Sequence, residues 1–223
     1  MVSITVWVLV GALILLAAAC LMDRDLFRAC WVFIAFAMVM ALIWLMLGEP
    51  WLALAEAVLG AGLTGGTLLW TLRGRGKRPR LAPLDRTPRR RRLTAHLRWL
   101  MTLTWLGLTS LAIGQLQGLD ARMHPLSVDT LFALTGLLVM SLGLWAFAAQ
   151  RHLLRLLLAF NLIGSGVFLL LASVAVPRAE VRALILIGLT VGLLGSVLGA
   201  AVLLRLHALT GQVSLMTPPK ASA

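Results

Sequence analysis

The sequence is short of acidic residues and cysteine, with eight Asp and Glu against twenty Lys and Arg and only two cysteines. Cys20 and Cys30 lie in apolar sequence, too few and too buried to predict a disulfide framework or a metal site. We expect both to be small core residues. Metal-ligand spacings are also lacking, so we expect no redox cofactor and no metal. The four histidines lie at or beyond the ends of the apolar runs: His96, His124, His152 and His207.

The apolar runs also lack the alternation of period two that a membrane β-barrel requires. The chain is 61% hydrophobic, and its runs repeatedly reach the length that a helix needs to cross a bilayer. We therefore predict an all-α membrane protein with about seven transmembrane helices. The fourth is only moderately apolar, so an even number stays open if it lies on the surface. The expected spans are 3–22, 27–47, 51–72, 99–117, 128–148, 154–174 and 182–204.

The first apolar run has no positive charge before it, unlike a secretory signal peptide. Its segment Leu16-Ala17-Ala18-Ala19-Cys20 resembles a lipoprotein cleavage site, but the leucine stands one place too far from the cysteine. We therefore expect this run to be retained as a membrane span.

Positive charge is distributed unequally between the two sides that seven spans define. Three of the twenty Lys and Arg (Arg122, Arg178 and Arg182) fall on the side of the N-terminus, and seventeen fall on the other side. Basic residues favour the cytoplasmic side of a membrane. The charges thus predict an N-terminus outside and a C-terminus in the cytoplasm.

A basic linker, residues 73–98, separates the two apolar halves of the chain. It contains eleven Lys and Arg, including the run Arg89, Arg90, Arg91 and Arg92, against the single acid Asp85. Such a segment attracts anionic lipid. The alternative is a solvated connector that fixes topology and touches lipid without specificity. No nucleic-acid-binding fold accompanies the run, so we expect no nucleic-acid partner.

Glu56 is the only charged residue in the 22-residue run from Trp51 to Leu72. A carboxylate in a membrane span costs a few kcal/mol, and such residues usually have a function. Two interpretations stay open: a structural acid that reaches the interface or pairs with an arginine, and a protonatable group inside a helix bundle. A relay would need partner subunits, because no other span carries an ionisable residue deep inside it.

Glycines follow Glu56 closely, in the segment Gly60-Ala61-Gly62-Leu63-Thr64. The spacing also matches a dinucleotide-binding motif, but that motif requires a preceding strand, so the match is accidental here. Small residues permit close helix packing. Alternatively, they loosen the helix into a kink or π-bulge that admits water. We name six residues as a possible polar path or hinge: Gly60, Gly62, Thr64, Asn161, Ser165 and Thr190.

The first three spans resemble a known family in Gly48-Glu49-Pro50-Trp51, Ala55-Glu56-Ala57 and the glycine segment that follows. They are similar to the three-helix D-type subunit of membrane-bound hydrogenases. The same domain occurs in the large A subunit of Mrp-type cation/proton antiporters. The resemblance implies a proton-pathway role for Glu56. The turn departs slightly from the family pattern, which has aspartate where this chain has Trp51.

Residues 128–205 resemble a second family through two segments, Ala149 to Leu171 and Ala183 to Val191. This family is the C subunit of Mrp antiporters and the related K subunit of proton-pumping NADH:quinone oxidoreductase. The resemblance places K-subunit acids near Asn161 and Gly195, where this chain has none.

Together the resemblances imply a non-enzymatic accessory subunit of a multi-subunit antiporter, hydrogenase or complex I-like assembly in a bacterial or archaeal cytoplasmic membrane. Its partners would be large antiporter-like subunits and other small subunits, and it would contribute to proton translocation through Glu56. The alternative is a purely structural scaffold. The expected organisation is a three-helix module (1–72), the linker (73–98), an extra helix and loop (99–127), a second three-helix module (128–208) and a tail (209–223).

Overall fold

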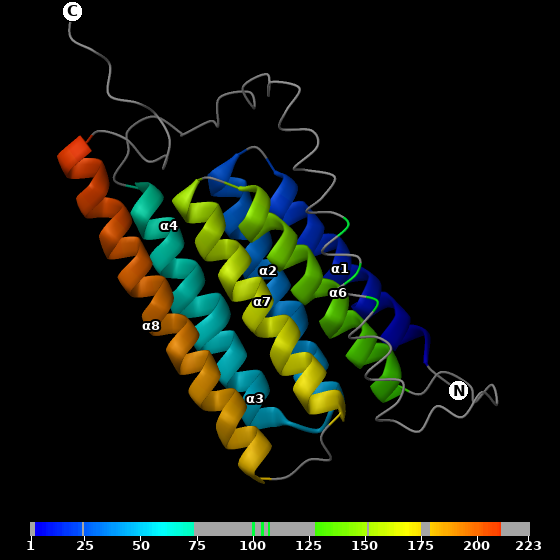
Figure 1. Cartoon of the computed structure of the whole chain (residues 1–223). Coiled ribbons are helices and arrows are strands. Elements are labelled where there is room, and N and C mark those ends of the chain that lie inside the picture. The colour runs from blue at the N-terminus through cyan, green and yellow to red at the C-terminus, as the bar shows by residue number, and fades with distance from the viewer. Residues whose placement is uncertain are drawn as a thin grey trace, which may run out of the picture.

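The protein is described by a computed structural model, in which all the elements of the described residues are helices (Figure 1). The described residues are 3–23, 25–73, 128–150, 152–174 and 179–210, with Leu100, Thr104 and Gly107. The helices are α1 (Ile4–Met22), α2 (Leu26–Met46), α3 (Pro50–Ala55), the π-helix η1 (Glu56–Thr64), α4 (Gly65–Arg73), α6 (Val128–Ala149), α7 (Leu153–Val174) and α8 (Ala179–Thr210).

Six of these helical stretches are long and apolar enough to cross a membrane, and α3, η1 and α4 together form the third. They coincide with six of the seven predicted spans. The last helix is longer than predicted, because α8 begins before residue 182 and continues past residue 204. The predicted span 99–117, apart from Leu100, Thr104 and Gly107, lies outside the described residues. So do the Arg89–Arg92 run and the tail beyond Thr210.

The turn between α2 and α3 follows from three adjacent residues. Gly48 has a φ of 75°, a left-handed conformation that favours glycine. The backbone N–H groups of Gly48 and Glu49 then bond the carbonyl oxygens of Leu45 and Trp44, which ends α2 with a Schellman motif. Pro50 starts α3, where its missing N–H costs nothing. This turn fixes Glu49 at the end of the bundle and sets the direction of the helix that carries Glu56.

The three helical stretches before residue 74 pack against the three after residue 127, and we call the two groups the N-terminal and C-terminal modules. The N-terminal module consists of α1, α2 and the α3–η1–α4 helix; the C-terminal module consists of α6, α7 and α8 (Figure 1). Contacts between the modules join α1 to α6, α2 to α7, and α8 to α3, η1 and α4. One apolar core runs through both modules. The site described below lies where η1 meets α7 and α8.

Glycines bring the helices of the C-terminal module close together. A Cβ atom at Gly136 would lie 2.7 Å from the carbonyl oxygen of Gly166, so α6 and α7 touch backbone to backbone. Four glycines of α8, at positions 188, 192, 195 and 199, face α7. Added Cβ atoms at Gly188 and Gly199 would collide with Phe168 and Leu157. Small residues thus let α8 approach α7, the packing that glycine permits in membranes.

Polar contacts join the two modules at opposite ends of the bundle. At one end, the buried Arg155 of α7 donates to the backbone carbonyl oxygens of Leu21 (2.5 Å) and Asp23, where α1 ends. A cation there satisfies free carbonyl groups and the negative end of the helix dipole. At the other end, Arg182 of α8 forms a 2.7 Å ion pair with Glu49.

Arg155→Met should lower the free energy of unfolding by about 2 kcal/mol, because hydrogen bonds from a charged donor contribute about that much. Arg28→Met is the matched control, since 73% of the Arg28 side chain is exposed and its partner Asp23 lies 3.6 Å away. It should change stability by less than about 0.5 kcal/mol. Thermal unfolding in detergent measures both. An unchanged melting temperature for Arg155→Met would show that desolvation of the guanidinium cancels its hydrogen bonds.

Candidate functional site: a polar cavity between the modules

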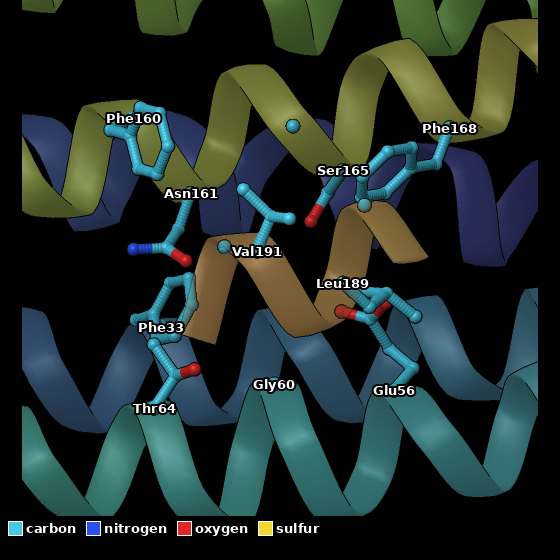
Figure 2. Close-up of a pocket in the computed structure, with 13 residues that line it drawn as sticks. Phe33, Glu56, Gly60, Thr64, Phe160, Asn161, Ser165, Phe168, Leu189 and Val191 are labelled. Carbon is cyan, nitrogen blue, oxygen red and sulfur yellow. The ribbon is translucent and has the colours of Figure 1, made fainter. Parts of the chain in front are cut away.

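A cavity of about 100 Å³ lies between η1, α2, α7 and α8. At about 30 Å³ per water molecule, it has room for about three. Most of its lining is aromatic, aliphatic or glycine. Four polar side chains share it, two from each module: Glu56, Thr64, Asn161 and Ser165 (Figure 2). Because neither module encloses this space alone, the cavity is a product of their contact.

Glu56 lies inside the bundle, with only 2% of its surface exposed. Its carboxyl group reaches into the cavity, on the side where Ser165 projects from α7 (Figure 2). Within the described part of the chain, Oε2 has no hydrogen-bond partner and the carboxyl group forms no ion pair. Of the two interpretations of this acid, the structure therefore places it inside the bundle and excludes an arginine partner from the described residues.

The side chain of Trp44, on α2, is a further polar neighbour of Glu56 and does not line the cavity. Trp44 is fully buried and lies close enough to influence the Glu56 carboxyl group. Its Nε1 nevertheless makes no hydrogen bond within the described residues. The carboxyl group thus has two polar surroundings, the indole N–H of Trp44 and the cavity beside α7.

The glycines after Glu56 form a π-helix of nine residues, η1. This is the local distortion that the glycine segment suggested as one alternative. Close packing, the other alternative, also occurs: a Cβ atom at Gly65 would lie 2.5 Å from Ile34. At Gly60, an added Cβ would lie 2.8 Å from Oε1 of Glu56 and 3.6 Å from the Cβ of Ala37. Gly60 therefore leaves the space that the carboxyl group occupies.

Asn161 joins α7 to α8 at the cavity. Its amide nitrogen donates to the carbonyl oxygen of Leu157 (2.8 Å) and to the hydroxyl oxygen of the fully buried Ser196 (2.7 Å). Since the nitrogen is used in these two bonds, the carbonyl oxygen Oδ1 is left for other partners. Oδ1 lies 3.9 Å from the position of a Cβ at Gly192, which also lines the cavity.

Of the residues that the sequence singled out, the structure brings together Glu56, Gly60, Thr64, Asn161 and Ser165. The other two, Gly62 and Thr190, face outward and do not line the cavity. The hydroxyl of Thr190 donates to the carbonyl oxygen of Leu186, one turn back in its own helix. Whether a residue lines the cavity depends on how its helix is rotated about its own axis. Apolarity and sequence spacing do not predict that rotation.

Sequence reasoning missed Trp44 and assigned Arg155 only to a basic side of the membrane. A tryptophan in an apolar run carries no distinguishing signal, because most of them face lipid or pack in the core. The structure gives Trp44 a place beside Glu56 and buries Arg155 against α1.

The comparison with known families agrees with part of this arrangement. Residues 11–77 match the MbhD family model, which describes the D subunit of MBH. The match supports the resemblance of the N-terminal module to a D-type membrane subunit and includes Glu56 and all of η1. It ends before the C-terminal module, whose resemblance to C and K subunits stays a prediction. No curated protein and no solved structure matches the chain.

Gly60→Ala should destabilise the protein, because its new methyl group would displace the Glu56 carboxyl group within a packed space. Gly66→Ala is the matched control: it lies in the same span, with nothing within 4 Å of its added Cβ. Alanine normally stabilises a helix relative to glycine by about 1 kcal/mol. We expect a lower melting temperature for Gly60→Ala and an equal or higher one for Gly66→Ala. An equal rise in melting temperature for both variants would contradict the tight contact between Gly60 and the Glu56 carboxyl group.

Proposed function

We propose that the chain is an accessory, non-redox membrane subunit of a multi-subunit assembly, either an Mrp-type cation/proton antiporter or a hydrogenase or complex I-like machine. Glu56 contributes one protonatable site to a proton path that partner subunits complete. The observation that carries this proposal is the buried carboxyl group, which faces a cavity with three other polar side chains and lacks a counter-charge in the described residues. The family match over residues 11–77 supports the class of assembly.

The chemistry of the lining suits proton exchange through water. A carboxyl group at a water-holding cavity can accept a proton from water and return it. The hydroxyl groups of Thr64 and Ser165 both donate and accept hydrogen bonds, and Oδ1 of Asn161 accepts them. These groups would orient about three water molecules beside Glu56. Among the described residues, Glu56 is the only ionisable one that lines the cavity. The path must therefore continue through residues of other subunits.

The membrane setting belongs to the same proposal. The chain would lie in a bacterial or archaeal cytoplasmic membrane, with its N-terminus outside and its basic linker against anionic lipid on the cytoplasmic side. The two inter-module contacts fit alternating spans, since α1 ends where α7 begins and α3 begins where α8 begins. Its partners would be large antiporter-like subunits and small subunits of the same complex.

A purely structural role is the second candidate. Asn161 and Gly195 stand where the resemblance places K-subunit acids, and Asn161 is engaged with Ser196 in a contact between two helices. In that case the chain would seal and position the membrane arm, and Glu56 would be dispensable.

Glu56→Gln should abolish or strongly reduce ion-driven proton movement, because the amide cannot take up and release a proton at neutral pH. The measurement is the pH change in inverted membrane vesicles that contain the whole complex, normalised to assembled complex. Glu180→Gln, at the exposed start of α8, is the matched control and should transport like wild type. Full transport by an assembled Glu56→Gln complex would reject the proton-path role of Glu56 and leave only the structural role of the chain.

A further inference from the structure

Two buried polar atoms lack partners in the described residues: Nε1 of Trp44 and Oε2 of Glu56. Their side chains are neighbours, because α2 packs along η1 and Trp44 acts on the Glu56 carboxyl group. Buried indole N–H groups and buried carboxyl oxygens normally find partners. An orphaned polar group in a dry interior costs about 1–3 kcal/mol. These two orphans are complementary, because one is a donor and the other an acceptor. A small rotation of the Glu56 side chain toward α2 would satisfy both.

The protonation state of Glu56 decides how much that contact contributes. An indole N–H only donates, and an ionised carboxylate only accepts, so the contact is a charge-assisted hydrogen bond. A protonated carboxyl group carries its own O–H donor, and the indole has no acceptor for it. The hydroxyl of Ser165, or water in the cavity, can accept a hydrogen bond from that O–H. The two states of Glu56 therefore prefer different neighbours, the indole N–H of Trp44 for the ionised form and acceptors in the cavity for the protonated form.

In the part of the chain that the structure describes, no ionisable side chain other than Glu56 lines the cavity. The neighbouring lining comes from Phe33 of α2, from Asn161 and Ser165 of α7, and from Leu189 of α8, none of which carries a charge. Among the described residues, Trp44 is thus the group that stabilises the ionised form of Glu56 over the protonated form.

We propose that Trp44 is a positioning residue for Glu56: its indole N–H holds the ionised carboxylate against α2, and the protonated side chain turns toward Ser165 in the cavity. This inference rests on the proposed function in that Glu56 must change protonation state. Proton uptake would then move the carboxyl group from the interior of the N-terminal module to the interface with the C-terminal module.

The test is an infrared pH titration of the whole complex, following the C=O stretching band of protonated carboxyl groups. The Glu56 band is the one that disappears in Glu56→Gln. Trp44→Phe keeps an aromatic ring and removes the N–H donor. Its Glu56 band should persist about one pH unit higher than in wild type, a tenfold change in proton affinity, because the ionised form has lost its donor.

Trp31→Phe is the matched control, since Trp31 lies on the same helix with 54% of its surface exposed. It should leave the band midpoint unchanged. A purely structural role for Trp44 would lower stability without moving the midpoint, and an unmoved midpoint in an assembled Trp44→Phe complex overturns the inference.

A second measurement needs no Trp44 variant and covers the case in which that variant fails to assemble. Ultraviolet resonance Raman spectra of the wild-type complex report hydrogen bonding of indole N–H groups. We expect one indole signal to change between low and high pH, with the same midpoint as the Glu56 band, and to stay constant in Glu56→Gln. A pH-independent indole signal would overturn the inference. A third outcome is an indole signal that follows the Glu56 band, together with full transport by the Glu56→Gln complex. This outcome would support the inference about Trp44 and reject only the proposed proton path.

Discussion

The buried carboxyl group of Glu56 is the constraint on which the rest of this structure depends. An acid within a membrane span must be neutralised, paired or hydrated. The described residues offer it no counter-charge, so accommodation comes from space and hydrogen-bonding groups. Gly60 leaves room for the side chain, and the second module supplies the polar far wall of the cavity. Because both modules belong to one chain, each Glu56 always has the C-terminal module beside it.

Glycine has two different roles in building this site. In η1, it allows a π-helix, whose wider turn changes the faces that Glu56 and Thr64 present. In α8, glycines at positions 188, 192, 195 and 199 let α7 approach closely. Phe168 then lies against Gly188, and Asn161 lies against Gly192. The first effect shapes one wall of the cavity, and the second sets the distance between the other two helices. Both depend on the missing Cβ, and neither requires a positive φ.

The two polar contacts between the modules explain how a polar cavity persists inside an apolar bundle. Arg155 holds α7 to the end of α1, and Arg182 holds α8 to the turn before α3. Contacts at the two opposite ends restrict both sliding and rotation of one module on the other. The cavity lies between them, where apolar packing alone would allow the helices to close.

Much of the architecture was predictable, because span length and apolarity are properties of sequence alone. Glu56 stood out for the same reason, as one charge in a long apolar run. The grouping of Thr64, Asn161 and Ser165 around it followed in part from their polarity, but Thr190 has the same polarity and faces away. That distinction needs the rotation of α8, which its glycine contacts decide. Trp44 was unpredictable, since only three-dimensional proximity to Glu56 distinguishes it from seven other tryptophans.

The most direct measurement is a cryo-electron microscopy map of the whole complex in lipid nanodiscs, at a resolution that shows ordered water. Our account predicts water density between the Glu56 carboxyl group and Asn161, with α7 and α8 closing the cavity against η1. Density for a partner arginine on Glu56, or a Glu56 side chain turned out to lipid, would contradict it.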